Sequence, residues 1–473
     1  MALAILSEER RKWWTLTAVS FGLFMIMLDN TVVNVALPAI QEDLGTDISE
    51  LQWIVTGYAL TFAALMLIGG KLADAYGRRL IFVVGILVFT GASLWCGLAD
   101  SGNMLIAARV VQGAGAALMN PATLSIIAAT FPPKERGMAI GIWAGTAALA
   151  LAIGPLVGGL LTEHLSWHWI FFVNIPVGVI AIAASFLLIT ESKDNTHESL
   201  DLPGLATSAL GLFTLTYGLI EANTYGWTSA RIVGSFVIAV IALASFVQIE
   251  RRRRSPMLDL TLFRSGTYTG ANIAMLLVAL AMFGIFFFVS LYMQNILGYS
   301  AVQAGAAFLP MTVLIILVAP FAGKASDKYG SRWLMTIGMV LLGVQLLYLS
   351  QLGSDASFWN LLPGFFVGGV GMAMTMTPTA AAATRAVPVE KSGVGSAVLN
   401  AMRQVGGSLG IALMGAIVAA QTSKQPSVEG FMAGFERALI VAALIAFAGS
   451  IVAFALVRQE AATEEPAPME VAA

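Results

Sequence analysis

Four ionisable residues stand out because they lie within, or at the end of, long apolar segments: Asp29, Arg109, Glu221 and Arg403. A charge in a hydrocarbon environment is costly, and such residues commonly carry protons, ions or substrates. Asp29 lies about 21 Å from the start of its segment. Arg109 lies about 9 Å from the start of a segment that runs in the opposite direction. In a hydrocarbon core about 30 Å thick, the two residues therefore lie at the same depth. The guanidinium of Arg109 would favour the ionised form of Asp29, whereas removal of water would favour its protonated form. A small rearrangement could therefore switch the protonation of Asp29. The sequence therefore predicts proton coupling at Asp29 and Arg109, with a structural ion pair as the alternative.

The other two charges and some nearby amides are candidates for a second acidic site or for substrate binding. Glu221 lies near the end of its segment, either as a solvated helix end or as an acidic group that assists coupling and attracts cationic substrates. Arg403 lies near mid-depth, where it could balance charge or contact substrate. Asn30, Asn34 and Gln112 are the nearest polar candidates to the expected pair, and we expect them to contact substrate.

An aromatic and methionine-rich run is a candidate substrate wall. It includes Phe283, Phe287 and Tyr292. Flexible and aromatic side chains suit a pocket that accepts varied lipophilic molecules. The alternative is that these side chains are bulk facing lipid.

The sequence offers no catalytic, metal or cofactor pattern. It contains no nucleophile triad, no metal-ligand cluster and no glycine loop of the nucleotide-binding kind. The single cysteine, Cys96, lies in an apolar run, so we expect no disulfide and no cysteine metal site. We therefore expect no enzyme activity and no cofactor, and an ion gradient as the energy source, worth about 2.3 kcal/mol per charge per 100 mV.

Composition identifies the elements that must position these residues. Of 473 residues, 58% are apolar and 11% charged, with a net charge of −2. This excludes most soluble enzymes, disordered proteins and nucleic-acid binders. Fourteen apolar segments are long enough to span a bilayer, and they lack the alternation of barrel strands, so an all-α polytopic membrane protein is predicted. The segments lie near residues 15–38, 50–69, 80–99, 103–127, 137–161, 167–190, 202–222, 230–249, 268–292, 301–323, 333–352, 357–384, 393–420 and 436–457.

Basic residues predict the orientation. When the connecting loops are assigned alternately to the two sides of the membrane, twenty of the 25 Lys and Arg residues fall on one side. Three fall on the other side, namely Arg231, Lys424 and Arg437, and two lie within segments, namely Arg109 and Arg403. Lys and Arg concentrate in cytoplasmic loops, so both termini are expected in the cytoplasm. We expect the first segment to be an uncleaved anchor.

An internal repeat divides the chain. Residues 70–79 and 323–332, each following an apolar segment, share Gly, Lys, Asp, Tyr, Gly and Arg at matching positions. Two copies in the same orientation imply two six-helix bundles related by a pseudo-two-fold axis along the membrane normal. The expected units are an amino-terminal bundle (1–190), two inserted helices with a basic linker (191–264), a carboxy-terminal bundle (265–458) and a tail (459–473).

The repeated loop resembles a signature of the major facilitator superfamily, and within it of the 14-helix drug:proton antiporters. An aspartate at a helix boundary can accept hydrogen bonds from a neighbouring helix N-terminus, and glycine permits the tight turn, so the loops could latch one conformation. Ala75 stands where the family usually has Arg. The expected latch residues are Gly70, Asp74, Gly77 and Arg78 in the first copy and Asp327 and Arg332 in the second.

Two further segments carry the resemblance. Arg109 and Gln112 fit the fourth-helix motif, and the fifth segment is similar to the antiporter pattern, with Ala150 in place of one glycine. The pattern residues are Gly141, Gly154, Pro155, Gly158 and Gly159.

The resemblance implies a monomeric antiporter of the cytoplasmic membrane that exchanges protons for lipophilic, cationic drugs by alternating access and binds no nucleic acid. Two alternatives stay open. One is a dedicated exporter of a single lipid, siderophore or antibiotic, and the other is a membrane sensor that transports nothing.

Overall fold

The computed structural model describes residues 8–193, 201–253, 256–388, 392–425 and 427–458. Within these ranges the chain is helical and contains no strand. Thirteen helices are long and apolar enough to cross a membrane. The helix α5 is bent by 40° between Met138–Leu151 and Ile153–His164, and it adds a fourteenth span if these two segments are counted as one. The predicted class, a polytopic helical membrane protein, is confirmed.

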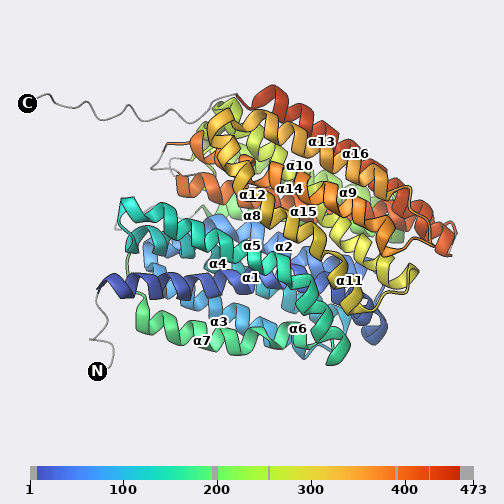
Figure 1. Ribbon diagram of the computed structural model, residues 1–473, viewed down its shortest axis with the longest axis horizontal. Helices are drawn as coiled ribbons and strands as arrows, with labels where there is room; N and C mark the ends of the chain where they lie inside the picture. Colours follow the sequence, from blue (N-terminus) through green and yellow to red (C-terminus); the bar gives the residue numbers. More distant parts are fainter. Residues whose placement is uncertain (1–7, 194–200, 254–255, 389–391, 426, 459–473) are drawn as a thin grey trace, which may run out of the picture.

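The amino-terminal helices pack on one another as one group, coloured from blue to green in Figure 1. The helix α4 can pack closely on α2 because Gly113 has no side chain: a Cβ at this position would clash with the carbonyl oxygen of Tyr58. The group comprises α1 (Glu8–Leu44), α2 (Ile48–Tyr76), α3 (Arg78–Gly97), α4 (Gly102–Thr130), α5 (Pro133–His164), α6 (Trp169–Phe172) and α7 (Asn174–Leu188).

The carboxy-terminal helices form a second group around α10 and α15, which pack side by side. A small helix, η2 (Leu260–Arg264), precedes it, and a π-helical turn, η3 (Tyr292–Ile296), follows α10. The group comprises α10 (Gly266–Leu291), α11 (Ala301–Ala307), α12 (Leu309–Tyr329), α13 (Ser331–Leu349), α14 (Phe358–Arg385), α15 (Ser392–Thr422) and α16 (Val428–Leu456).

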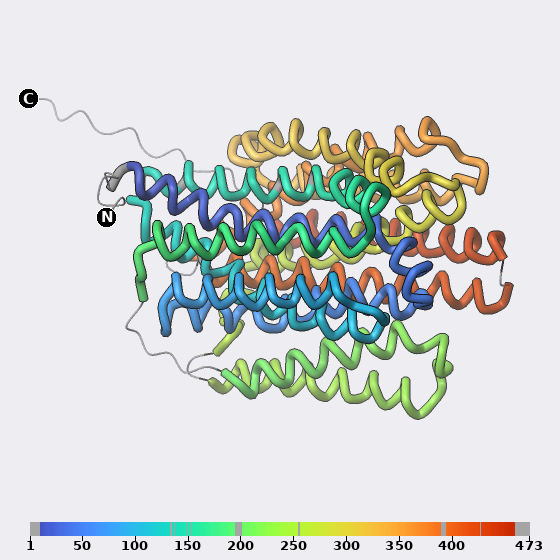
Figure 2. Tube along the Cα trace, turned by 90° about the horizontal axis from the view of Figure 1, so that it is seen from below, coloured from blue at the N-terminus to red at the C-terminus, as the bar shows by residue number. Residues whose placement is uncertain are grey.

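Two helices between the groups, α8 (Leu202–Tyr225) and α9 (Ala230–Arg252), form a hairpin at the edge of the bundle (Figure 2). The helix α8 touches both groups. Its Glu221 accepts a hydrogen bond from the indole N–H of Trp53 in α2 (3.1 Å), and its Asn223 donates to the carbonyl of Ala416 in α15 (2.7 Å).

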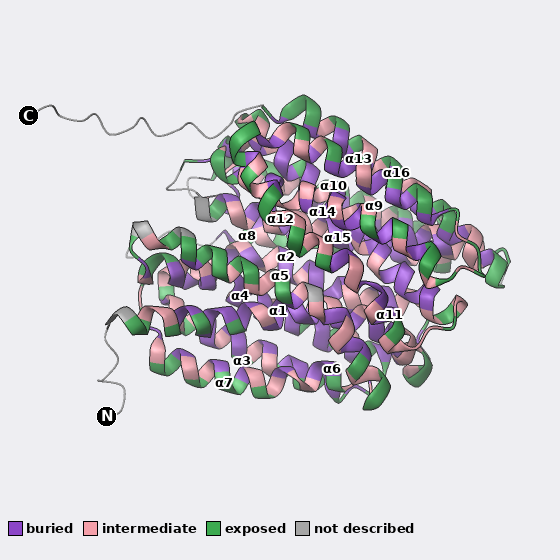
Figure 3. Ribbon diagram, in the orientation of Figure 1, coloured by how far each residue is buried: buried purple, intermediate pink, exposed green. Residues whose placement is uncertain are grey.

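The two groups meet at the end of the molecule opposite to the start of α1 and the end of α16, on the right of Figure 1. There Gln294 donates to the carbonyl of Val35 and the amide of Val302 donates to the carboxylate of Glu163, each at 2.9 Å. Buried residues lie between the packed helices, whereas exposed ones gather on the outer helix faces and in the connections (Figure 3). The exposed apolar faces, such as those of α9 and α12, are those that lipid would cover.

Candidate functional site

The centre of the amino-terminal group holds a buried charge network. Asp29 of α1 and Arg109 of α4 form an ion pair with 0% and 1% of their side chains exposed. Gln112, one turn after Arg109, connects both members: it accepts from Arg109 Nη1 (2.6 Å) and donates to Asp29 Oδ1 (2.9 Å). Both oxygens of the carboxylate therefore have partners, and the network is neutral as a whole.

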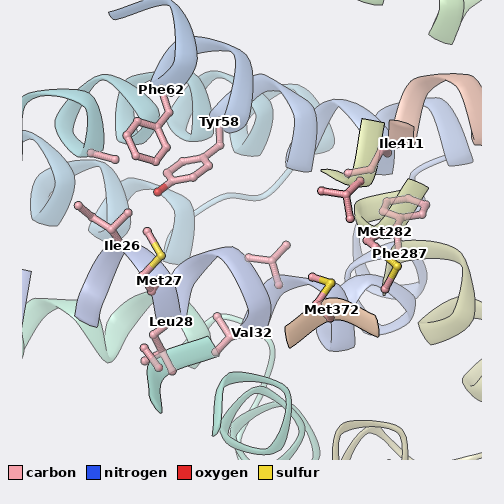
Figure 4. Packing of buried hydrophobic residues seen from close by; sticks show 14 of the residues in the cluster. Ile26, Met27, Leu28, Val32, Tyr58, Phe62, Met282, Phe287, Met372 and Ile411 are labelled. Carbon is pink, nitrogen blue, oxygen red and sulfur yellow. The ribbon is translucent and has the colours of Figure 1, made fainter. Parts of the chain in front are cut away.

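Further contacts hold the arginine in place. Arg109 Nε donates to the carbonyl of Ile54 (3.1 Å), and its guanidinium lies 4.3 Å from the ring centre of Tyr58. Gln112 also donates to the hydroxyl of Ser93 at 2.8 Å. Figure 4 shows the apolar character of the surroundings, where Tyr58 and Phe62 of α2 face residues of α1.

The structure brings together the two charges that the sequence analysis put at one depth, but it gives Gln112 a different place from the one expected. Gln112 is fully buried between Asp29 and Arg109, so it belongs to the charge network and offers substrate no free surface. Ser93 and Tyr58 were not foreseen, since a serine or tyrosine within an apolar segment gives no sign of which charge it will face.

The other predicted polar residues lie in different surroundings. Asn30 and Asn34 are partly exposed and bond to carbonyls of their own helix, Ile26 and Asn30. Glu221 is held by Trp53 at the contact between α8 and α2, apart from the charge network.

The predicted aromatic wall is only partly supported. Phe287 and Tyr292 are 0% and 1% exposed, because they pack inside the carboxy-terminal group, and Tyr292 stacks on Phe435. Neither residue can line a substrate site in this conformation, and neither faces lipid. Phe283 is partly buried beside Gly407 of α15 and stays a candidate.

Arg403 of α15 is partly exposed, and its Nε is buried without a hydrogen-bond partner among the described residues. The unpartnered Nε separates this arginine from Arg109, whose Nε and Nη1 atoms both have partners.

The two loop copies form different ion pairs. In the first, Asp74 pairs with Arg78 of the same loop (2.9 Å), and Gly77 has a φ of 122°, which favours glycine. In the second, Asp327 pairs with Arg385 at the end of α14 (2.8 Å) and not with Arg332, whose guanidinium lies over the ring of Phe454.

The antiporter pattern in α5 faces two partners. A Cβ at Gly158 would lie 2.7 Å from the carbonyl oxygen of Val32 in α1, and Gly154 packs on the same helix, whereas Gly159 lies against Ala301 at the start of α11. Pro155 also contacts the carboxy-terminal group, since a Cβ at Gly305 would meet its backbone. Gly141 has nothing within 4 Å of its Cβ position and contributes no close contact.

Within the described residues, no three His, Cys, Asp or Glu side chains lie together as metal ligands. The single thiol, Cys96, is buried 3.7 Å from the Gln112 carbonyl oxygen.

Two groups of membrane-spanning helices, one with a buried ion pair at its centre, are typical of a secondary transporter. The chain belongs to the Major Facilitator Superfamily, whose sequence profile matches residues 19–410 and again residues 271–472.

Curated relatives include resistance proteins. The chain is 37% identical over 412 residues to the tetracenomycin C resistance and export protein of Streptomyces glaucescens, covering 87% of this chain and 77% of that one. It is 35% identical over 472 residues to the puromycin resistance protein of Streptomyces alboniger, with 96% and 94% covered. A multidrug resistance protein of Mycobacterium tuberculosis is 36% identical over 418 residues, with 88% and 77% covered.

Solved structures share the fold. A bacterial homologue of the human lysosomal transporter Spinster aligns with a TM-score of 0.67 at 17% identity, covering 95% of this chain and 97% of that one. A POT family transporter aligns with a TM-score of 0.68 at 13% identity, with 92% and 94% covered.

Proposed function

We propose that this protein exports lipophilic drugs from the cell in exchange for protons. It would reside in the cytoplasmic membrane as a monomer with both termini in the cytoplasm, as the distribution of Lys and Arg favours. The resistance and export functions named for relatives that match most of the chain support this proposal.

The observation that carries proton coupling is the network of Asp29, Arg109 and Gln112. Asp29 is the member of the network that can take up a proton, because arginine stays protonated and glutamine does not titrate. A buried carboxylate is stable only while its partners neutralise it, so a movement that separates α1 from α4 would favour proton uptake. Proton binding and helix movement are thereby linked at one residue.

Alternating access would consist of rocking residues 1–190 against residues 265–458. With the cytoplasmic termini on the left of Figure 1, the contacts between the groups lie at the outer end, so this conformation would be open toward the cytoplasm. In the opposite state the loop residues Asp74 and Asp327 would act as latches at the cytoplasmic end.

The first test compares Asp29→Asn with Glu221→Gln. The amide introduced by Asp29→Asn cannot take up and release a proton, so ethidium efflux driven by a pH gradient should fall to the level of cells lacking the protein. The amide introduced by Glu221→Gln keeps an oxygen that can accept from Trp53, so efflux should persist. Equal membrane levels of both variants, measured by immunoblot, exclude a folding defect.

The reverse outcome, active Asp29→Asn and inactive Glu221→Gln, would move the coupling role to Glu221. If both variants exported ethidium at the wild-type rate, neither carboxylate would couple transport to protons.

A dedicated exporter is the second candidate, since two of the relatives are named for single antibiotics. A resistance panel on overexpressing cells separates the candidates. Protection against many unrelated compounds supports a multidrug exporter, and protection against one compound supports a dedicated one.

A further inference from the structure

A positive charge at the contact between the two helix groups has no partner among the described residues. Arg403 forms no ion pair or hydrogen bond with any residue that the structure describes, and its Nε is buried. The Tyr58 phenol of α2 lies near it, and no carboxylate of the described residues forms an ion pair with it. A charge held inside a membrane protein is costly when nothing neutralises it.

The neighbouring residues of α15 also present unused hydrogen-bond donors. Gln404 Nε2 and Ser408 Oγ are buried without a partner in the described structure. Gln404 and Ser408 are four positions apart and therefore lie on one face of α15. Gly415 lies on the same face and packs against Gln52 of α2. Gln404 and Ser408 therefore point toward the amino-terminal group.

Tyr58 adds a further hydroxyl on the opposite side. It points toward Asn30 without completing a hydrogen bond. A guanidinium, an amide N–H and two hydroxyls can all donate, and the first two of these groups cannot accept. Among these groups only the guanidinium belongs to a partly exposed side chain, so it is the donor that a substrate can reach in this conformation.

The acidic groups nearby are already engaged. Asp29 is neutralised by Arg109 and Gln112, and Glu221 accepts from Trp53. A cationic drug would find no free carboxylate among these residues and would be repelled by Arg403. Arg403 therefore does not offer a cationic group a binding place.

We propose that Arg403 forms a subsite for an ionised carboxylate or phenolate on an otherwise lipophilic substrate. The proposal rests on the proposed export of drugs and specifies their chemical class. The guanidinium can bind such an anion with two parallel hydrogen bonds. Phe283 of α10, next to Gly407, would contact the apolar part of the substrate.

The test measures binding of two dyes that share a xanthene ring, anionic fluorescein and the cationic ester rhodamine 6G. Fluorescence anisotropy with the purified full-length protein gives both affinities at a pH where fluorescein is ionised. Removing a hydrogen bond to a charged group costs about 1.5–3 kcal/mol, so Arg403→Gln should weaken fluorescein binding about tenfold to a hundredfold. Binding of rhodamine 6G should stay unchanged or improve, and Arg403→Lys should retain part of the fluorescein affinity.

A matched control is Arg231→Gln, which removes one positive charge from α9 at the edge of the molecule, where Arg231 lies 3.9 Å from the ring of Tyr225. It should leave fluorescein binding unchanged. The thermal unfolding temperature of each variant without dye shows whether it is folded. Unchanged fluorescein affinity in folded Arg403→Gln, or an equal loss for both dyes, would overturn the subsite.

Proteoliposomes with an imposed pH gradient separate this proposal from the proposed function. If fluorescein binding depends on Arg403 but neither dye is transported when the pH gradient is imposed, the subsite is supported and proton-coupled export is contradicted. If rhodamine 6G is transported when the pH gradient is imposed while fluorescein is neither bound nor transported, export is supported and the subsite is contradicted.

Discussion

At the scale of single residues, the buried charges differ in how they are neutralised. Asp29 and Arg109 neutralise each other and share Gln112, whereas Arg403 has no counter-charge among the described residues. The first arrangement suits a proton that binds and leaves as helices move. The second suits a ligand that brings its own charge.

Gln112 allows a prediction about the network. Replacing it with leucine (Gln112→Leu) removes an acceptor from Arg109 and a donor from Asp29, and unsatisfied buried groups cost about 1–3 kcal/mol each. The rate of ethidium efflux per amount of protein in the membrane should therefore drop about tenfold or more. Cys96→Ser, a change 3.7 Å from the same amide, should leave the rate within about twofold of wild type. A fully active Gln112→Leu variant would show that the bridge is dispensable.

At the scale of elements, α5 connects the two groups. Gly154 and Gly158 let it approach α1, and Gly159 lets it approach α11. Pro155 lies between these positions, and its carbonyl would meet a Cβ at Gly305. One helix therefore packs within its own group and against the other group over a single turn, which explains why small residues cluster there.

A pair of glycine variants tests this role of α5. In Gly158→Ala the new methyl would lie 2.9 Å from the Val32 Cα, and overpacking of this kind costs about 1–3 kcal/mol. The thermal unfolding temperature of the purified protein should fall. Gly141→Ala meets nothing within 4 Å and replaces a weak helix former, so the temperature should be equal or higher. The same decrease in both variants would mean that close approach to α1 is not the reason for Gly158.

The loop copies also differ as elements. Asp327 is joined to the end of α14 by Arg385, which in turn donates to Ser326 and Ser331. In the first copy Asp74, near the end of α2, bonds to Arg78 at the start of α3, so this contact joins two consecutive helices.

At the scale of the whole molecule, the two groups are joined by the packing of α15 on α2 and, at one end, by a few specific hydrogen bonds. The amide of Val302 bonds to Glu163 and the side chain of Gln294 to Val35. Rocking of the groups would have to break these hydrogen bonds and separate Gly159 from α11. The inserted helix α8 touches both groups near the same end, through Glu221 and Asn223.

Cross-linking tests whether this end must open. In a Cys96→Ser background, the pair Glu163→Cys and Val302→Cys treated with a short bifunctional thiosulfonate should lose dye efflux, and reductant should restore it. The matched control is Glu191→Cys with Leu80→Cys, a carboxylate-to-amide contact of 3.1 Å within the amino-terminal group. This link should leave efflux intact. Sustained efflux through a cross-linked 163–302 pair would mean that transport needs no separation at this end.

The class of the molecule and the relative depth of its charges follow from the amino-acid sequence, whereas the expected fourteen spans are thirteen, or fourteen if the bent α5 counts as one. Apolar length and charge scarcity are properties of segments, and helix rise converts residue number into depth, so Asp29 and Arg109 could be put at one level without coordinates.

Tertiary structure alone decided which side chains share partners. Helix rotation turned Phe287 and Tyr292 into the interior, set Gln112 between two charges and joined Asp327 to Arg385. It also left Arg403 without a counter-charge among the described residues, which the sequence could not show. The reason is physical: in a segment that is apolar all round, no periodic pattern of polarity marks the face that packing will bury.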